Sequence, residues 1–436
     1  MSSDKTKVGN FFISNYPQYS FWRPENVPEV LDCISQKPQP NSPLGIYLHL
    51  PFCRKRCHFC YFRVYTDKNA AEIKDYIDAT IQELSLYSQQ TFVAGRLPEF
   101  IYFGGGTPSY LSREQFRYLV GEMKKIFPWD KAEEVTVECE PGTLTEEKIR
   151  NFKELGVTRL SLGIENFDDG ILELNNRAHR SKEVYRAYDF ARSVGFDQIN
   201  IDLIAGMMGE SDENWLEVIQ KTIEMSADSV TIYQMEIPFN TSIYKEMKKK
   251  GEDVAPVAGW QTKRRWVDEA FSAFEKAGYK VLDAYTVVKN PEVTRFVYRE
   301  KLWTGADMIG LGVSSFGHIN GAHIQNEKDY GPYLKRVKSN EFPINRGLVI
   351  TDDEKMIREF ILQMKTGSVD LSYFTKKFSV NICTQFSQVL EKLSEDLFLS
   401  VDKATHTIEL NRKGLLQVDV LLHEFFLPEH RNARYT

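Results

Sequence analysis

The stretch "GIYLHLPFCRKRCHFCYF", residues 45–62, holds two signals in immediate succession. Its first six residues form a near-continuous apolar run of the kind found in buried parallel strands. The residues that follow place three cysteines close together, Cys53, Cys57 and Cys60, with no fourth cysteine within reach. In parallel barrels, functional residues gather where strands end and loops begin. The stretch therefore predicts a first strand with a cysteine-bearing loop at its carboxyl end.

The same order of strand and helix recurs along the chain. Amphipathic helical patterns occupy residues 70–90, 112–127 and 182–195. Between them we expect six strands, at 45–50, 99–105, 134–140, 159–165, 199–206 and 229–235. Regular alternation of strand and helix implies a parallel sheet with crossover helices. The predicted fold class is α/β: a partial (β/α)6 barrel of the TIM type, with an N-terminal arm and a mainly helical, winged-helix-like C-terminal domain.

Four consecutive segments are predicted from changes in composition. They are an aromatic arm and Pro-rich linker at 1–44, the partial barrel at 45–280, a barrel extension with a Gly-rich motif at 281–345, and the C-terminal domain at 346–436. Thr351 and Glu354 form a capping-box pattern, and a hairpin is expected at 398–410. We interpret the aromatic residues at 10–22 as core packing or as a flap over a substrate mouth. The C-terminal domain is interpreted as a packing domain or lid.

Composition and charge exclude several classes of protein. The 436 residues carry a net charge of −6 and a pI of about 5.9, which argues against a nucleic-acid protein held by bulk electrostatics. No apolar run approaches the ~20 residues that span a bilayer, and residues 1–10 lack the apolar core of a signal peptide. We expect a cytoplasmic protein with no nucleic-acid partner and no membrane span. In that reducing compartment a tight cysteine cluster suggests a metal rather than disulfides.

The three clustered cysteines are one ligand short of a closed tetrahedral zinc site. His58 could supply a fourth ligand, although its position next to Cys57 makes chelation of the same ion awkward. An iron–sulfur cluster is the alternative, because three cysteines can hold three irons of a 4Fe–4S cubane while the fourth iron stays open. An open iron suits one-electron chemistry on a cofactor bound beside it. The missing fourth cysteine therefore favours a catalytic cluster.

The spacing Cys-x3-Cys-x2-Cys after the first strand, joined by "GGGTPSYL" (104–111) after the second, resembles the radical S-adenosylmethionine (SAM) superfamily. Within it, the chain resembles the HemN/HemW group: oxygen-independent coproporphyrinogen III oxidases, haem chaperones and class C radical SAM methyltransferases. The matching motifs cover nearly the entire chain, in the family's order: YLHLPFC (47–53), FGGGTPSYL (103–111), TVECEPGTL (136–144), TRLSLGIENF (158–167), NNRAH (175–179), NIDLIAG (200–206) and GLGVSSFG (310–317).

The resemblance implies cofactors and a cofactor site. It implies a 4Fe–4S cluster on Cys53, Cys57 and Cys60, and one or two molecules of SAM, cleaved to methionine and a 5′-deoxyadenosyl radical that abstracts hydrogen from a substrate. Backbone around Phe59 is expected to meet the adenine, and residues 232–238 are a candidate lining for a second SAM. The residues expected to line the first SAM site are Tyr47, Gly105, Gly106, Thr107, Glu138, Glu165, Arg177, Asp202 and Phe316.

The chemistry of these residues suits SAM. Bare glycine backbone at 104–106 can approach the amino acid part of the cofactor. Glu138 can accept hydrogen bonds from ribose hydroxyls or the ammonium group, and Arg177 can pair with the carboxylate through its planar fork. Asp202 lies in an otherwise apolar strand, where an unpaired carboxylate would be costly. We therefore expect Asp202 to have a partner.

Three departures separate the chain from the two familiar activities of the group. Phe62 stands where the oxidase has a further cysteine, Glu165 stands where the family commonly has glutamine, and residues 294–303 lack the His-Asn pair of the chaperones. The sequence therefore favours a radical SAM enzyme that transfers a methyl or methylene group with two SAM molecules.

Three alternatives stay open at this stage. They are oxidative decarboxylation of coproporphyrinogen III, a haem chaperone without turnover, and a cysteine cluster that holds zinc. The expected partners are a small organic substrate, of tetrapyrrole, heteroaromatic or lipid-like type, and an electron donor such as flavodoxin or ferredoxin.

Overall fold

The computed structural model describes residues 5–7, 9, 11–402, 404–431 and 433. The chain forms two compact units, each assembled from separate segments: the first from 1–21, 204–294 and 350–436, the second from 22–203 and 295–349. Parts of the predicted arm (1–4, 8 and 10) and of the predicted C-terminal domain (403, 432 and 434–436) lie outside the described residues. The division into four consecutive segments stays a prediction. Among the helices described, none is both long and apolar enough to cross a bilayer.

The second unit is built on a sheet whose first five strands are parallel. Its strands are β1 (Leu44–Leu50), β2 (Phe100–Gly105), β3 (Glu134–Cys139), β4 (Arg159–Glu165), β5 (Gln198–Ala205), β9 (Asp307–Leu311), β10 (Phe316–Ile319), β11 (Ala322–Asn326) and β12 (Ile344–Val349). They lie in the order β12-β11-β10-β9-β1-β2-β3-β4-β5, with β9 also parallel to β1 and with β10, β11 and β12 antiparallel. The first five predicted strands are confirmed to within one residue at each end.

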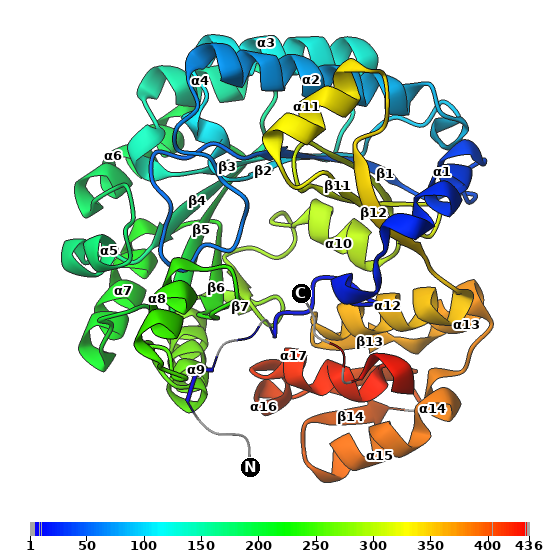
Figure 1. Cartoon of the computed structure of the whole chain (residues 1–436). Helices are drawn as coiled ribbons and strands as arrows, with labels where there is room; N and C mark the ends of the chain where they lie inside the picture. The colour runs from blue at the N-terminus through cyan, green and yellow to red at the C-terminus, as the bar shows by residue number, and fades with distance from the viewer. Residues whose placement is uncertain (1–4, 8, 10, 403, 432, 434–436) are drawn as a thin grey trace. The chain divides into compact units, whose positions relative to one another are not determined.

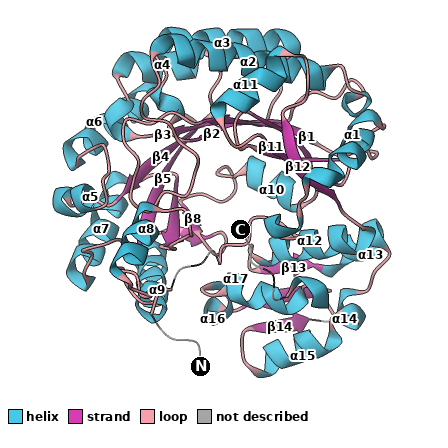
Figure 2. Cartoon of the chain, in the orientation of Figure 1, coloured by secondary structure: helices cyan, strands magenta, loops and turns pink. Residues whose placement is uncertain are grey.

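Helices cover the outer side of these parallel strands (Figures 1 and 2). The helices of this unit are α1 (Val27–Ser35), α2 (Ala70–Ser88), α3 (Arg113–Ile126), α4 (Glu146–Glu154), α5 (Asp169–Leu174), α6 (Ser181–Val194), α10 (Val297–Trp303) and α11 (Tyr330–Lys338). Helix α2 begins at a capping box formed by Asn69 and Glu72, which satisfies backbone N–H groups of its first turn. The predicted α/β fold with a parallel sheet is confirmed.

Helix α10 differs from the others because it lies against the inner side of the sheet (Figure 1). The centre of the Tyr298 ring lies 4.4 Å from that of Tyr102 and 5.6 Å from that of Phe100. The Val297 N–H donates to Glu134 Oε2 at 3.0 Å. Phe100 and Glu134 are the first residues of β2 and β3, so α10 fills the inner side at the amino ends of the strands. The opposite, carboxyl ends carry the predicted site.

The first unit contains the arm, the sixth predicted strand and the C-terminal domain. Its central elements are α7 (Asp212–Met225), β6 (Ser229–Gln234), α8 (Ser242–Lys250), α9 (Trp260–Lys276), β7 (Lys280–Val281) and β8 (Thr286–Val288). Strand β8 pairs antiparallel with both β6 and β7. The strand predicted at 229–235 is confirmed as β6.

The C-terminal domain combines helices with a small sheet. It contains α12 (Asp352–Met364), β13 (Ser368–Asp370), α13 (Leu371–Phe378), α14 (Ile382–Gln385), α15 (Ser387–Glu395), β14 (Leu399–Asp402), β15 (Thr407–Leu410), α16 (Arg412–Leu415) and α17 (Val418–Leu421). The capping box of Thr351 and Glu354 is present, and the predicted hairpin is confirmed as β14 and β15. Strand β13 pairs with β15 and completes a three-stranded sheet. This order of helix, strand, helices and hairpin agrees with the predicted winged-helix-like domain.

The arm packs inside the first unit. Ile13 and Tyr16 have no exposed surface. The Ile13 N–H donates to Asp419 Oδ1 at 2.9 Å, and the buried Lys263 ammonium donates to Thr6 Oγ1 at 2.8 Å. These contacts favour the interpretation of residues 11–21 as packing.

Candidate functional site

The loop between β1 and α2 carries all three clustered cysteines, and we call residues 51–65 the cysteine loop. A hydrogen bond from the Cys53 N–H to the Tyr65 carbonyl (3.1 Å) closes it at its base. The His58 N–H donates to the Asn175 carbonyl (3.1 Å), which ties the loop to the segment before α6. The loop is thus closed at its base and held near its middle, and Cys57 and Cys60 lie on either side of His58.

Each thiol of the cysteine loop has its own hydrogen-bond donor. The Thr107 hydroxyl lies 3.3 Å from Cys53 Sγ, Arg177 Nη1 lies 3.3 Å from Cys57 Sγ, and the Phe62 backbone N–H donates to Cys60. Burial raises the pKa of Cys53 to about 11 and that of Cys60 to about 12. Both thiols are therefore protonated in the free protein, and a positively charged group is needed to hold them as thiolates.

The arrangement of possible ligands distinguishes between the two metal groups that the sequence suggests. Within the part of the chain that the structure describes, no three His, Cys, Asp or Glu side chains converge on a point as a single ion requires. A 4Fe–4S cluster takes its thiolates at separate corners, so its ligands need not converge. His58, the alternative fourth ligand, directs Nδ1 at the Leu174 carbonyl oxygen at 3.2 Å. Three thiols spread along one loop, each with a donor, fit the larger cluster.

The glycine-rich turn after β2 packs directly against the cysteine loop. A side chain at Gly106 would lie 3.0 Å from Cys53 Sγ and 2.9 Å from the Leu50 carbonyl oxygen, too close for a methyl group. Gly105 has a φ of +110°, and a side chain there would lie 2.5 Å from His49 Nδ1. Only glycine lets the two loops approach this closely. The glycines predicted to admit SAM are thus also required by the packing around Cys53.

Three carboxyl groups gather at the carboxyl-end half of three neighbouring strands: Glu138 on β3, Glu165 on β4 and Asp202 on β5. We call them the carboxylate cluster. Glu138 accepts hydrogen bonds from the Tyr102 hydroxyl (2.7 Å) and the Gly105 N–H (3.0 Å), so it also supports the glycine-rich turn. Strands β3, β4 and β5 pair in parallel register, which brings the three groups together although 64 positions separate the first from the last, 202 minus 138.

The predicted partner of Asp202 is present. The Ser161 hydroxyl donates to Asp202 Oδ2 at 2.8 Å, and Asn200 Nδ2 donates to Oδ1 at 2.9 Å. Both partners are neutral, so they satisfy the hydrogen-bonding capacity of the carboxylate without balancing its charge.

The carboxylate cluster is difficult to ionise in the free protein. Burial, reinforced by the charge of Asp202, raises the pKa of Glu138 to about 7. Burial likewise raises the pKa of Glu165 to about 7, although Arg177 works in the opposite direction. The pKa of Asp202 is also raised by burial. A cationic ligand would lower the pKa of the three carboxyl groups, because a nearby positive charge favours their ionised forms.

Arg177 connects the carboxylate cluster to the cysteine loop. Its Nη2 lies 3.5 Å from Glu165 Oε1 and donates to the Gly163 carbonyl, while Nη1 faces Cys57 Sγ. Burial alone would lower the pKa of Arg177, but the neighbouring Cys57 and Glu165 outweigh it and raise the pKa, so the guanidinium stays charged. Its buried Nε–H finds no hydrogen-bond acceptor among the described residues. This donor is available to a ligand, as the predicted pairing with the SAM carboxylate requires.

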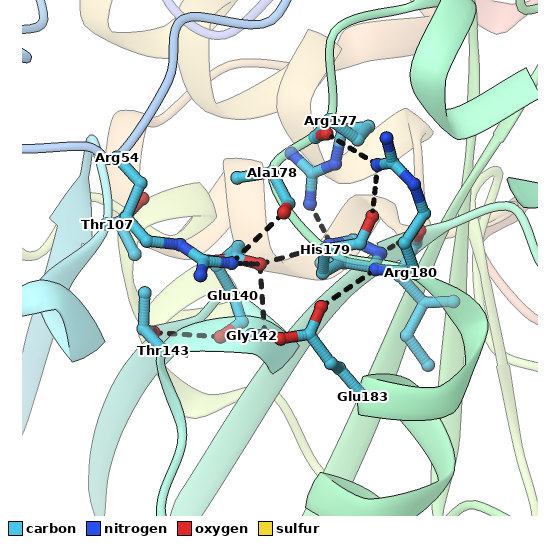
Figure 3. Close-up of polar contacts among 12 residues, drawn as sticks. Arg54, Thr107, Glu140, Gly142, Thr143, Arg177, Ala178, His179, Arg180 and Glu183 are labelled. Carbon is cyan, nitrogen blue, oxygen red and sulfur yellow. Dashed lines mark hydrogen bonds and ion pairs between the residues drawn. The ribbon is translucent and has the colours of Figure 1, made fainter.

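A second charged group includes Arg54 of the cysteine loop (Figure 3). We call Glu140, Arg54 and His179 the Glu140 network. Glu140 Oε1 accepts from Arg54 Nη2 (3.1 Å) and from the Gly142 N–H (2.9 Å), and His179 Nδ1 lies 3.2 Å away. Burial would raise the pKa of Glu140, but His179, Arg177 and Arg54 outweigh it and lower the pKa to about 2. Its charge is balanced by the protein.

The sequence analysis missed the Glu140 network. Arg54 also donates to the Ala178 carbonyl (3.2 Å), so the network joins the cysteine loop to the segment before α6. The available signals were an acid-x-acid pattern at 138–140 and a basic residue directly after Cys53. Neither signal identifies a partner, because the partner lies far away along the chain.

The remaining predicted residues lie in three places around the site. Tyr47 bonds through its hydroxyl to His49 Nδ1 (3.1 Å) and stacks on Tyr102, with ring centres 5.9 Å apart. Phe59 lies on the cysteine loop and is half-buried. Phe316 begins β10 and packs its ring edge-to-face against Trp22 at 5.6 Å. Their contact with SAM stays a prediction.

Comparison with known proteins places these features in a family. Residues 47–222 match the family model described as the radical SAM superfamily. The oxygen-independent coproporphyrinogen III oxidase of Helicobacter pylori is 29% identical over 367 residues, 80% of this chain and 78% of the oxidase. The heme chaperone HemW of Haemophilus influenzae is 31% identical over 282 residues, 64% of this chain and 70% of the chaperone.

A solved structure shows the same fold. Coproporphyrinogen III oxidase (HemN) from Escherichia coli, described as a radical SAM enzyme, matches with a TM-score of 0.81 at 22% identity. The match covers 97% of this chain and 99% of that one.

Proposed function

Because the chain belongs to the radical SAM superfamily, in its HemN/HemW-like group, we propose that it is an enzyme whose Cys53, Cys57 and Cys60 hold a 4Fe–4S cluster. A 4Fe–4S cluster and SAM are the cofactors of this superfamily. The proposal is supported by the three thiols on one loop, each with a separate hydrogen-bond donor. When bound, the two cofactors supply a 5′-deoxyadenosyl radical that removes a hydrogen atom from the substrate.

The observation that carries the proposal is the carboxylate cluster beside the cysteine loop. SAM has an ammonium and a sulfonium group, which supply positive charge, and a carboxylate. Glu138, Glu165 and Asp202 offer negative charge that the protein leaves unbalanced, and the Arg177 Nε–H offers a donor. We assign these groups to the first SAM, with the other lining residues being Tyr47, Phe59, Gly105, Gly106, Thr107 and Phe316.

For the reaction itself we propose one-carbon transfer with a second SAM. Phe62 occupies the position where the oxidases of the group carry a further cysteine, and its side chain is 40% exposed. Its ring lies 4.4 Å from that of Tyr61 and 6.2 Å from that of His49. This part of the cysteine loop therefore offers an aromatic surface instead of a thiol. A small organic substrate of tetrapyrrole, heteroaromatic or lipid-like type, and a flavodoxin or ferredoxin as electron donor, complete the proposal.

Coproporphyrinogen III oxidation is the second candidate. It is favoured by the name of the Helicobacter pylori relative, of which the chain covers 78%. The chaperone named among the relatives supports haem binding without turnover as a further alternative.

Product analysis separates these reactions. The protein is reconstituted anaerobically with iron and sulfide, reduced, and mixed with SAM and either coproporphyrinogen III or a candidate heteroaromatic or lipid substrate. One-carbon transfer yields 5′-deoxyadenosine together with S-adenosylhomocysteine. Oxidation yields 5′-deoxyadenosine and methionine without the homocysteine product, and efficient formation of protoporphyrinogen IX would overturn the one-carbon proposal. Haem binding with no substrate-dependent consumption of SAM would replace it with the chaperone.

A further inference from the structure

We propose that Arg177 sets the reduction potential of the cluster by donating a charge-assisted hydrogen bond to the Cys57 thiolate. This inference rests on the proposed function in one respect, since it takes Cys57 as a cluster ligand. It assigns Arg177 a role that is separate from holding the SAM carboxylate.

The contact itself is the first observation. Arg177 Nη1 lies 3.3 Å from Cys57 Sγ, within the usual range of a hydrogen bond to sulfur. Only 11% of the Arg177 side chain is exposed, so water screens the interaction little. The guanidinium is charged, because an arginine side chain is not deprotonated in proteins.

The three cysteines differ in the kind of donor that faces them. Cys53 receives a bond from the neutral hydroxyl of Thr107, and Cys60 receives one from a backbone N–H. Cys57 alone of the three has a cationic donor among these contacts. Charge-assisted hydrogen bonds are roughly twice as strong as neutral ones. The electrostatic effect on the cluster is therefore expected to be largest through Cys57.

Backbone contacts hold Arg177 independently of its side chain. The Arg177 N–H donates to the Leu172 carbonyl (2.8 Å), and Arg180 Nη1 donates to the Arg177 carbonyl (3.1 Å). Next to it, the Ala178 carbonyl accepts from Arg54 of the Glu140 network (Figure 3). A replacement of the Arg177 side chain should thus leave the segment in place.

The direction of the effect follows from charge. One electron from the reductant makes the cluster more negative, and a cation beside a ligand thiolate stabilises the reduced form more than the oxidised form. Hydrogen bonds to the sulfurs are one of the known determinants of cluster potential. Arg177 therefore raises the potential and makes the cluster easier to reduce.

The test measures the midpoint potential before SAM is added, by titration with dithionite and mediator dyes followed by electron paramagnetic resonance. The variants are Arg177→Gln, Arg177→Met, Thr107→Val and Arg180→Gln, each reconstituted and assayed for iron. Arg180→Gln is the matched control, since it removes a charge three positions away that contacts backbone carbonyls. We expect Arg177→Gln to lower the equilibrium constant for reduction at least tenfold, about 59 mV for one electron. Arg180→Gln and Thr107→Val, which removes the neutral donor to Cys53, should lower this constant less.

Each outcome decides between the ideas. Full iron content with an unchanged potential in Arg177→Gln overturns the inference, as does an equal shift in Arg180→Gln. If Arg177→Gln fails to retain iron, Arg177→Met decides, because it also removes the charge and the donor: a lowered potential at full iron content supports the inference, and the wild-type potential overturns it. Failure of the unmodified protein to assemble any iron–sulfur cluster would instead overturn the proposed function.

Discussion

Two carboxyl groups at the end of β3, only two residues apart, ionise in opposite ways. Burial raises the pKa of Glu138 to about 7. Glu140 is also largely buried, but His179, Arg177 and Arg54 outweigh its burial and lower its pKa to about 2. The difference arises from their neighbours, because Glu138 bonds to a neutral hydroxyl and a backbone N–H, while Glu140 pairs with the Arg54 guanidinium and lies 3.2 Å from His179 Nδ1.

We interpret this difference as the contrast between a structural region and the proposed binding region. In the Glu140 network the protein supplies both signs of charge, through Glu140 and Arg54, and the network joins the cysteine loop to the segment before α6. In the carboxylate cluster three acidic groups share the influence of Arg177 and Arg159, and the pKa of each acid is raised. A region left with unbalanced, buried charge is a candidate ligand site. Cationic SAM would supply positive charge beside these three carboxyl groups.

The largest expected effect concerns the thiols that lie between the two regions. Replacing Cys53, Cys57 and Cys60 together with alanine should reduce the iron content after anaerobic reconstitution from about four per chain to none. The brown colour should disappear with it. Elemental analysis and the visible spectrum measure this directly. Stoichiometric zinc with no uptake of iron by the unmodified protein would contradict the proposed iron–sulfur cluster. The carboxylate cluster would then have no reason to be interpreted as a SAM site.

The next effect tests whether the Glu140 network is structural. Glu140→Gln leaves the Arg54 guanidinium without its counter-charge and should lower the free energy of unfolding by about 3 kcal/mol. Removing one partner of a buried ion pair costs about 3–5 kcal/mol of stability. We expect the low end of this range because the Arg54 side chain is 35% exposed. Chemical denaturation measures the change. The control is Glu138→Gln, which should change stability by less than about 1 kcal/mol. Equal losses in both variants would show that the two regions do not differ.

The carboxylate cluster is tested by SAM affinity. Glu138→Gln and Asp202→Asn should each weaken SAM binding by about 10- to 150-fold, because a charge-assisted contact contributes about 1.5–3 kcal/mol. Iron content should be unchanged, since the hydrogen bonds described for Glu138 and Asp202 include none to a cysteine of the cysteine loop. Isothermal titration calorimetry on the reconstituted protein gives the affinities. Wild-type affinity for SAM in both variants would show that SAM does not bind at the carboxylate cluster.

The smallest effect is a dependence of SAM binding on pH. Glu138 and Glu165 have pKa values of about 7 in the free protein, and in the proposed SAM complex their ionised forms would bind the cation. Affinity should therefore rise about eightfold between pH 6 and pH 7.5, which is the change in ionised fraction of one such group. Titrations at four pH values in one buffer series measure the slope, and Glu138→Gln should flatten it. A pH-independent affinity in the unmodified protein would contradict the assignment.

Folding stability should respond to pH in opposite directions in the two regions. Glu140 has a folded pKa below the ordinary 4.5, so its contribution is present above pH 4.5 and is lost as pH falls toward 2. Glu138 and Glu165 have folded pKa values above 4.5, so their contributions are present below pH 4.5 and are lost as pH rises through 7. Bound SAM should remove the second loss, because it favours the ionised groups.

The sequence by itself determined the framework of the protein. Strand periodicity and helix amphipathicity placed β1 to β6 and the hairpin of β14 and β15, because local side-chain patterns specify which segments bury an apolar face. The spacing of Cys53, Cys57 and Cys60 identified the cysteine loop, since all three thiols lie within eight consecutive residues. A lone Asp202 in an apolar strand was enough to predict that a partner exists.

Only the tertiary structure decided which side chains meet. It turned Arg177 toward Cys57, placed His49 beneath Gly105, and joined Arg54 to Ala178 across 124 positions of sequence. It also gave Glu138 and Glu140 opposite ionisation, although both are glutamates in one short motif. The physical reason is that a buried charge responds to the groups packed around it, and these come from strands and loops whose proximity is set by parallel pairing in the sheet rather than by distance along the chain.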